Sequence, residues 1–167
     1  MKHIFAAFVL AMACCSFSAA AEDGIEELCR EVLNSIAADD PVAYAQCYST
    51  NRHRKRQMSK LGPPLSTDDT QRLLGKFRQR NTTIRHSFRI MREQIPDPKA
   101  KIQFVSAEAK VKTETFRGLT ITATSQILLR FRVDEEEWVL HLDDGVLQDG
   151  QWFLSDGPVS LETPTKK

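Results

Sequence analysis

Hydrophobic residues recur at two different spacings along this chain, and the spacing changes near residue 100. Before that point, apolar residues repeat every three to four positions, as on one face of an amphipathic helix. After it, apolar and polar residues alternate, as in a strand with one buried face. The pattern therefore predicts helices first and a sheet second.

Two helices are predicted before residue 60. The first runs from about Gly24 to Ala38, with an apolar stripe of Ile25, Leu28, Cys29, Val32, Leu33 and Ile36. Asp39-Asp40-Pro41 ends it and begins the second, because aspartate caps helices and proline is accepted at the first helical position. The second helix is expected to fray near Met58, and it carries Val42, Tyr44, Ala45, Cys47 and Tyr48.

A third helix is predicted to begin after Ser66 or Thr67, with Asp68 and Asp69 in its first turn. Residues 84–94 also fit a strand in part, but helix to about residue 94 is favoured, and a break at residues 81–83 stays open. Pro96 and Pro98 end this helix. Its apolar positions are Leu73, Leu74, Phe77, Ile84, Phe88, Met91 and Ile95.

Four strands are predicted in the second part. The first alternates from Val105 to Val111, and the second has apolar residues at Ile121, Ala123, Ile127, Leu129, Phe131 and Val133. The third contains Trp138, Leu140 and Leu142, after a solvated turn at residues 134–137. Asp149-Gly150 is a hairpin signal that leads into the fourth strand, Trp152-Phe153-Leu154. We expect an α+β fold in which three N-terminal helices pack on a curved antiparallel sheet of about four strands.

The first 21 residues predict a secretory signal peptide. Met1-Lys2-His3 is a basic start, the apolar run Ile4 to Ala13 follows, and Ala19-Ala20-Ala21 precedes Glu22. That run is shorter than the roughly 20 residues of a membrane-spanning helix. We therefore expect an exported protein, periplasmic or secreted, without a transmembrane segment.

The expected domains are a signal peptide at 1–21, one α+β domain at 22–160 and a disordered tail at 161–167. Lipoprotein anchoring at Cys14 or Cys15 is a minor alternative, because Leu10 lies one position too far from Cys14 for a lipobox.

Charge is balanced overall but unevenly distributed. Only Lys2 of the 23 basic residues lies in the leader, so the remaining 22 match the 22 acids. Basic residues dominate positions 51–92, and acids dominate positions 134–162. One interpretation of the basic run is an anion-binding patch formed by Arg52, Arg54, Lys55 and Arg56. The favoured interpretation is a solvated charged surface, and the absence of interleaved aromatic residues argues against nucleic acid as a partner.

Two cysteines remain after the leader, Cys29 and Cys47. In an oxidising compartment, such a pair predicts a disulfide first and two free buried thiols second. The two residues are equidistant from position 38, so they would face each other in an antiparallel helical hairpin. Closing that loop would contribute about 3 kcal/mol.

Three segments resemble the nuclear transport factor 2-like superfamily, the cystatin-like cone of ketosteroid isomerases and polyketide cyclases. They are Asp39-Asp40-Pro41-Val42-Ala43-Tyr44, Leu140-His141-Leu142-Asp143-Asp144-Gly145 and Asp149-Gly150-Gln151-Trp152-Phe153-Leu154. The resemblance covers residues 23–156 and is to an exported, bacterial-type member. It implies a pocket between helices and sheet and often a dimer through the sheet. It does not imply one activity, because the same cone serves several enzymes and domains without catalysis.

An isomerase or lyase of this fold needs an acid or histidine in the cavity beside a donor for the developing oxyanion. The candidates are Tyr44 and Tyr48, one helical turn apart, and His141, which faces away from the side that holds Trp138. No metal-ligand spacing, cofactor motif or nucleophile arrangement is present in the sequence, so no metal or cofactor is expected.

We therefore expect a non-catalytic exported domain that binds a small apolar ligand or a protein partner, with a homodimer through the sheet as one form of the latter. The alternatives are a cone-fold isomerase or lyase, and an envelope-associated module that binds anions through residues 52–56.

Overall fold

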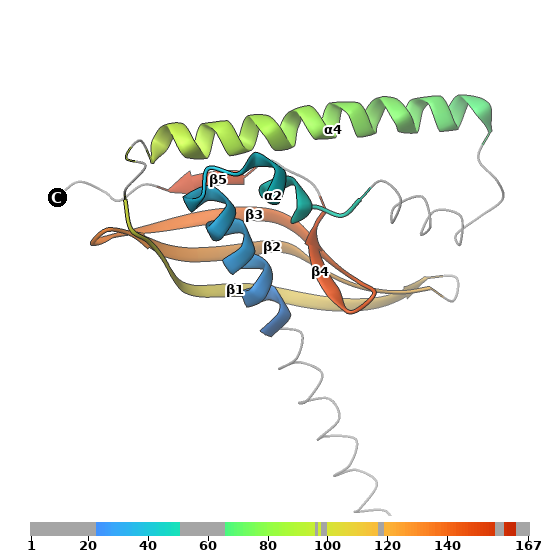
Figure 1. Ribbon diagram of the computed structural model, residues 1–167. Helices are drawn as coiled ribbons and strands as arrows, with labels where there is room; N and C mark the ends of the chain where they lie inside the picture. The colour runs from blue at the N-terminus through green and yellow to red at the C-terminus, as the bar shows by residue number, and fades with distance from the viewer. Residues whose placement is uncertain are drawn as a thin grey trace, which may run out of the picture.

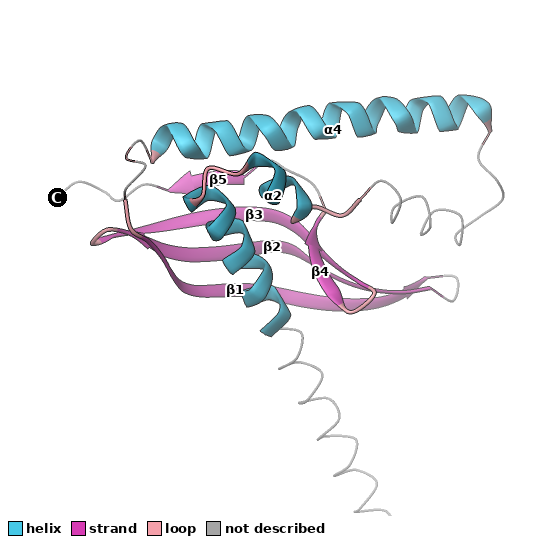
Figure 2. Ribbon diagram, in the orientation of Figure 1, coloured by secondary structure: helices cyan, strands magenta, loops and turns pink. Residues whose placement is uncertain are grey.

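The computed structural model describes residues 23–50, 66–95, 97, 100–116, 119–155 and 159–162. Within them, helical segments precede a five-stranded antiparallel sheet, which makes an α+β fold. The helix over residues 23–37 crosses in front of the strands, while α4 runs along the top of the molecule in Figure 1 with α2 below it. Figure 2 shows the same separation of helices and strands.

The helices begin and end close to where their sequence signals lie. Asp40 caps α2 (Pro41–Gln46), and its Oδ1 accepts hydrogen bonds from the backbone N–H groups of Val42 and Ala43 at 2.9 and 3.0 Å. This helix has only six residues, so it is shorter than predicted. The third helix, α4 (Thr67–Gln94), is continuous through residues 81–83 and remains helical over residues 84–94.

One long antiparallel meander builds most of the sheet. It contains β1 (Ile102–Phe116), β2 (Leu119–Val133) and β3 (Glu136–Gln148), which pair in that order. The turn at Asp149-Gly150, with φ of 50° and 85°, leads into β4 (Gln151–Leu154). Positive φ at both turn residues is the type I′ geometry that matches the twist of a hairpin.

A fifth strand, β5 (Val159–Glu162), extends the sheet beyond the four strands predicted. It pairs with Val139–Leu142 of β3, while β4 pairs with Gly145–Gln148, so the two short strands share one edge of β3. Alternation of apolar and polar residues over only four positions is too short to predict a strand. These residues form a strand because they pair with an open edge of β3. The predicted start of a disordered tail at residue 161 is therefore wrong for Leu161 and Glu162.

The sheet does not keep a single alternation along β2. Thr122 and Thr124 are buried, although Ile121 and Ala123 were predicted to share a face with Ile127. The β1–β2 register shifts between Ala109, which pairs with Ile127, and Val111, which pairs with Thr124. This shift moves the inward-facing positions of β2 by one residue. A second shift lies between Phe104 and Ser106, and such irregularities bend a sheet.

The core lies between the sheet and the helices. The helix over residues 23–37 contributes the predicted stripe from Ile25 to Ile36, and α4 contributes Ile84, Phe88 and Met91. From the sheet come Ile127, Leu129, Phe131, Trp138, Leu140, Leu142, Trp152 and Leu154. Burial of these side chains, each worth about 1.5–3 kcal/mol, is the main force that holds the layers together.

Candidate functional site

The tyrosines Tyr44 and Tyr48 meet inside this core. Their hydroxyl oxygens lie 2.9 Å apart in a hydrogen bond, and the residues are 0% and 2% exposed. The i, i+4 spacing places both side chains on one side of the turn that ends α2. The Phe88 ring packs on Tyr44 with centroids 5.3 Å apart.

Burial is the principal cause of a raised pKa at both tyrosines, because desolvation disfavours the phenolate. Burial raises the pKa of Tyr48 to about 12, and its hydrogen bond with Tyr44 and the charge of Arg80 oppose this rise. The pKa of Tyr44 is raised further, by burial first and by the neighbouring Tyr48 second. Both hydroxyls are therefore neutral at physiological pH and already bonded to each other.

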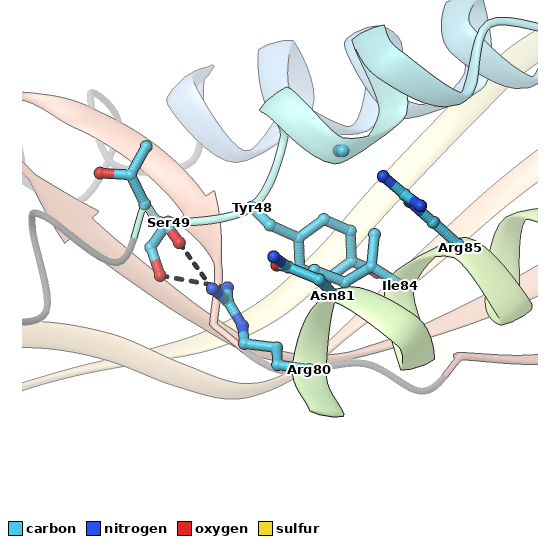
Figure 3. A pocket seen from close by; sticks show the side chains of 8 residues that line it. Tyr48, Ser49, Arg80, Asn81, Ile84 and Arg85 are labelled. Atoms are coloured by element: carbon cyan, nitrogen blue, oxygen red, sulfur yellow. Dashed lines mark hydrogen bonds between the residues drawn. The ribbon is translucent and has the colours of Figure 1, made fainter. Parts of the chain in front are cut away.

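Arg80 connects α4 to the chain that follows Tyr48. Its Nη1 donates to the carbonyl oxygen of Ser49 at 2.7 Å, and its Nη2 to that of Leu154 at 3.4 Å. Tyr48 forms a parallel bridge with Leu154, so one guanidinium connects α4 to Leu154 and to Ser49, the residue that follows Tyr48. Figure 3 shows the hydrogen bonds from Arg80 to Ser49. Arg80 is only 9% exposed, and its centre lies 5.7 Å from the Tyr48 ring centroid.

Sequence reasoning missed Arg80 because it counted the residue with the basic half of the chain. A signal was available, since Arg80 lies four residues before Ile84, on the same helical stripe as Phe88 and Met91. A charged residue on a buried stripe predicts a residue that is held by hydrogen bonds inside the fold.

A pocket of about 300 Å³ opens beside Tyr48 and Arg80. In Figure 3, Arg80 and Arg85 lie on either side of the Tyr48 ring, with Asn81 and Ile84 between them. Among the residues that the structure describes, the lining contains two arginines and no acid: Ala45, Tyr48, Ser49, Thr50, Arg80, Asn81, Ile84 and Arg85. Its electrostatic character is therefore positive.

Two further pockets are also bordered by charged side chains. One, of about 470 Å³, lies between the helix over residues 23–37 and α2, and Glu31 and Asp40 are among its lining residues. The other, of about 310 Å³, is lined by Glu26 and Glu108 together with Ile25, Ala107 and Ala109. All three pockets have charged side chains in their lining, whereas a pocket for an apolar ligand is lined predominantly by hydrophobic and aromatic side chains.

His141 lies on the opposite face of the sheet from the tyrosines. Its neighbours Leu140 and Leu142 point into the core, while its own Nε2 lies 2.8 Å from Oε1 of Glu162 and its Nδ1 lies 3.1 Å from Nε2 of Gln126. The structure therefore does not bring His141 together with Tyr44 and Tyr48.

Cys29 and Cys47 are both free and buried, so the predicted disulfide is not formed in this structure. The prediction assumed two long antiparallel helices, but α2 ends at Gln46 and Cys47 lies in the turn beyond it. The Cys47 thiol donates back to the carbonyl oxygen of Ala43 at 3.6 Å. Burial raises the pKa of each thiol to about 12, and the nearby Cys47 adds to the shift of Cys29.

The other predicted features lie outside the described residues. These are the signal peptide, Cys14, Cys15 and the basic residues Arg52, Arg54, Lys55 and Arg56. Among the residues that the structure describes, no helix is long and apolar enough to span a membrane. The same residues contain no group of three or more His, Cys, Asp or Glu side chains placed to hold a metal ion.

The buried polar residues bear on the catalytic alternative. Within the described part of the chain they are Ser35, Ser49, Arg80, Ser87, Thr122, Thr124 and Gln148. This set contains no carboxylate and no histidine, which are the groups that would move a proton in an isomerase or lyase. The tyrosine pair therefore has no buried acid or base beside it among these residues.

Comparison with protein-family models, curated proteins and solved structures gives no match to this chain.

Proposed function

We propose that this protein is an exported binding domain of the nuclear transport factor 2-like type, which associates with a second copy of itself through the outer face of its sheet. One observation carries the proposal: among the described residues, the large side chains between helices and sheet are almost fully buried, while the other face of the sheet carries charged and half-buried apolar residues. Binding is therefore expected at the sheet surface.

The interior of the fold supports this interpretation. Large side chains of the core are almost completely buried. Each of the following is at most 2% exposed: Trp152, Tyr44, Phe131 and Met91. Close-packed interiors leave few voids larger than a water molecule. An apolar ligand or substrate would have to displace these side chains before it could enter.

The outer face is defined here by alternation along β1, β2, β3 and β5. Residues next to buried ones along these strands point the other way. On β2 and β3 they include Leu128 and Val139, which are half-buried and lie beside the charged positions. The charged and polar members of the outer face are Glu108, Gln126, Arg130, Arg132, Glu137, His141 and Glu162.

Ion pairs across the strands hold this face in place. Arg130 lies between Glu108 and Glu137, with nitrogen to oxygen distances of 3.4 and 3.8 Å. A hydrogen bond between His141 Nε2 and Glu162 Oε1, 2.8 Å apart, connects β3 to β5. Partly exposed pairs of this kind contribute about 0–1 kcal/mol each, so their main effect is to order the side chains.

The size and charge of the outer face both suit a second copy. The three strands of 13 to 15 residues are about 45 Å long and together about 14 Å wide, and the four residues of β5 add a strip of about 13 Å by 5 Å. The resulting area of about 700 Å² is close to the roughly 800 Å² that each partner contributes to a standard interface. Because the face carries both arginines and glutamates, a two-fold axis can place Arg130 or Arg132 of one copy against Glu108 or Glu137 of the other.

Sedimentation velocity on the mature chain tests this proposal. We expect a dimer at protein concentrations of about 1 to 100 µM, because the weakest interfaces of standard size have dissociation constants in the micromolar range. Leu128→Lys combined with Val139→Lys places two like charges in the middle of the outer face and should give a monomer. Val42→Lys is the matched control: Val42 is 66% exposed on α2, away from the sheet, so this variant should remain dimeric.

Two outcomes would oppose the proposal. A wild-type chain that stays monomeric throughout the concentration range excludes the dimer, and a dimer that survives both lysines places the interface elsewhere. Native mass spectrometry of the same sample identifies the other occupants, because a co-purified apolar molecule or a different protein adds its own mass. Export is tested separately, since the mature N-terminus should lie near Glu22 and not at Met1.

A further inference from the structure

We propose that the pocket beside Tyr48 is a binding site for a small oxyanion, a phosphate or carboxylate group, in which Arg85 makes the direct contact. This site is on the helical side of the molecule and is independent of the outer sheet face. Nothing in the dimer proposal requires it.

The lining of the pocket decides the charge of the ligand. Arg80 and Arg85 provide two guanidinium groups, and none of the eight lining residues is acidic. Arginine remains charged at all physiological pH values, so two arginines on a pocket with no carboxylate among its eight described lining residues produce a lasting positive potential. The electrostatic free energy of binding in such a pocket is favourable for an anion, but not for a cation or an apolar group.

The two arginines have different roles. Arg80 is buried, and its guanidinium is held by the Ser49 carbonyl and hydroxyl oxygens and by the Leu154 carbonyl oxygen, at 2.7 to 3.4 Å. It therefore contributes a fixed charge to the lining of the pocket. Arg85 is exposed, and no ion pair joins it to another residue in the described part of the chain.

Arg85 is thus able to direct its planar set of N–H donors at a ligand. This geometry matches the two oxygens of a carboxylate or phosphate in a bidentate contact. Figure 3 shows Arg85 and Arg80 on either side of the Tyr48 ring, with the Asn81 side chain between them. The Asn81 amide and the Ser49 and Thr50 hydroxyls add polar groups to the same lining.

The volume limits the size of the ligand. A space of about 300 Å³ is at the lower end of the range for small-molecule sites, about 300–1,000 Å³. Both a free anion and the headgroup of an anionic lipid carry the oxyanion that the two arginines recognise. The experiment therefore needs one arm for each source.

The first arm measures thermal unfolding of the mature chain in inorganic phosphate and in sodium chloride of equal ionic strength. Phosphate at about ten times its Kd should raise Tm by about 4 °C, because a ligand that binds only the folded state stabilises it. Arg85→Gln should lose this shift, and its exposed position means that the fold is preserved. Arg89→Gln is the matched control: it lies one turn further along α4, pairs with Glu93 at 3.6 Å and does not line the pocket, so it should keep the shift.

The second arm measures co-sedimentation with phosphatidylglycerol vesicles and with neutral phosphatidylcholine vesicles. Loss of the phosphate shift in Arg85→Gln, without vesicle binding, indicates a free anion as ligand. Binding to anionic vesicles that Arg85→Gln loses and Arg89→Gln keeps indicates a lipid headgroup. The inference is overturned if neither probe binds, or if Arg85→Gln and Arg89→Gln behave alike in both arms. Dimerisation is read separately by sedimentation, so failure of this site leaves that proposal unaffected.

Discussion

Removing the hydroxyl of Tyr44 is the most direct test of how the tyrosine pair is used. In Tyr44→Phe the ring stays in place against Phe88, but the Tyr48 hydroxyl loses its partner at 2.9 Å. A buried polar group without a hydrogen bond costs about 1–3 kcal/mol. We expect the free energy of unfolding to fall by that amount, and Tyr48→Phe to have a similar effect.

The double variant separates this interpretation from a simple loss of packing. In Tyr44→Phe with Tyr48→Phe, no hydroxyl is left unpaired, so the total cost should be smaller than the sum of the two single costs. We expect a coupling energy of about 1–2 kcal/mol, within the range measured for groups in direct contact. A pair whose hydroxyls face a solvent-filled active site would show almost no coupling.

Urea unfolding followed by tryptophan fluorescence measures all four proteins, because Trp138 and Trp152 are both buried and report on the core. Thr115 and Thr120 provide the control, since their hydroxyls also form a bond, at 3.2 Å, but at an exposed position. Replacing both with valine should show coupling close to zero. Additive costs for the two tyrosines, or a Tyr44→Phe protein as stable as the wild type, would refute the reasoning.

Three further predictions concern stability and thiol chemistry. The unfolding free energy should fall as pH rises above about 9, because Cys29 and Cys47 have a pKa of about 12 in the fold and ionise near 9.0 when unfolded. Urea midpoints measured as a function of pH test this, and midpoints that show no decrease up to pH 11 would contradict it. In reduced native protein both thiols should resist iodoacetamide at pH 8 and both should react in urea, as counted by mass; labelling of the native fold contradicts their burial. Gly145→Ala should cost about 1–3 kcal/mol, since its Cβ would meet β2 side chains at 2.9 and 3.2 Å. Gly75→Ala, with open space in α4, should instead stabilise by about 0.5–1 kcal/mol, and equal effects of the two changes would exclude this explanation.

The amino-acid sequence by itself determined the local elements of this protein. The change from a spacing of three to four residues to strict alternation locates the helices and β1 to β4, because each period corresponds to one face of an element. Asp40 before Pro41 and the Asp149-Gly150 turn are equally local, since each acts through its own backbone geometry. These signals need no information about distant residues.

Only the tertiary structure decided how these elements meet. β5 exists because the edge of β3 near Leu140 accepts it, and the register shift near Ala109 decides which β2 residues are buried. The sequence alone does not distinguish the role of Arg80 from that of Arg85. The two roles differ because the carbonyl oxygens of Ser49 and Leu154 accept hydrogen bonds from Arg80. Contacts between residues far apart in the chain depend on packing in three dimensions, and no local pattern encodes the distance between them.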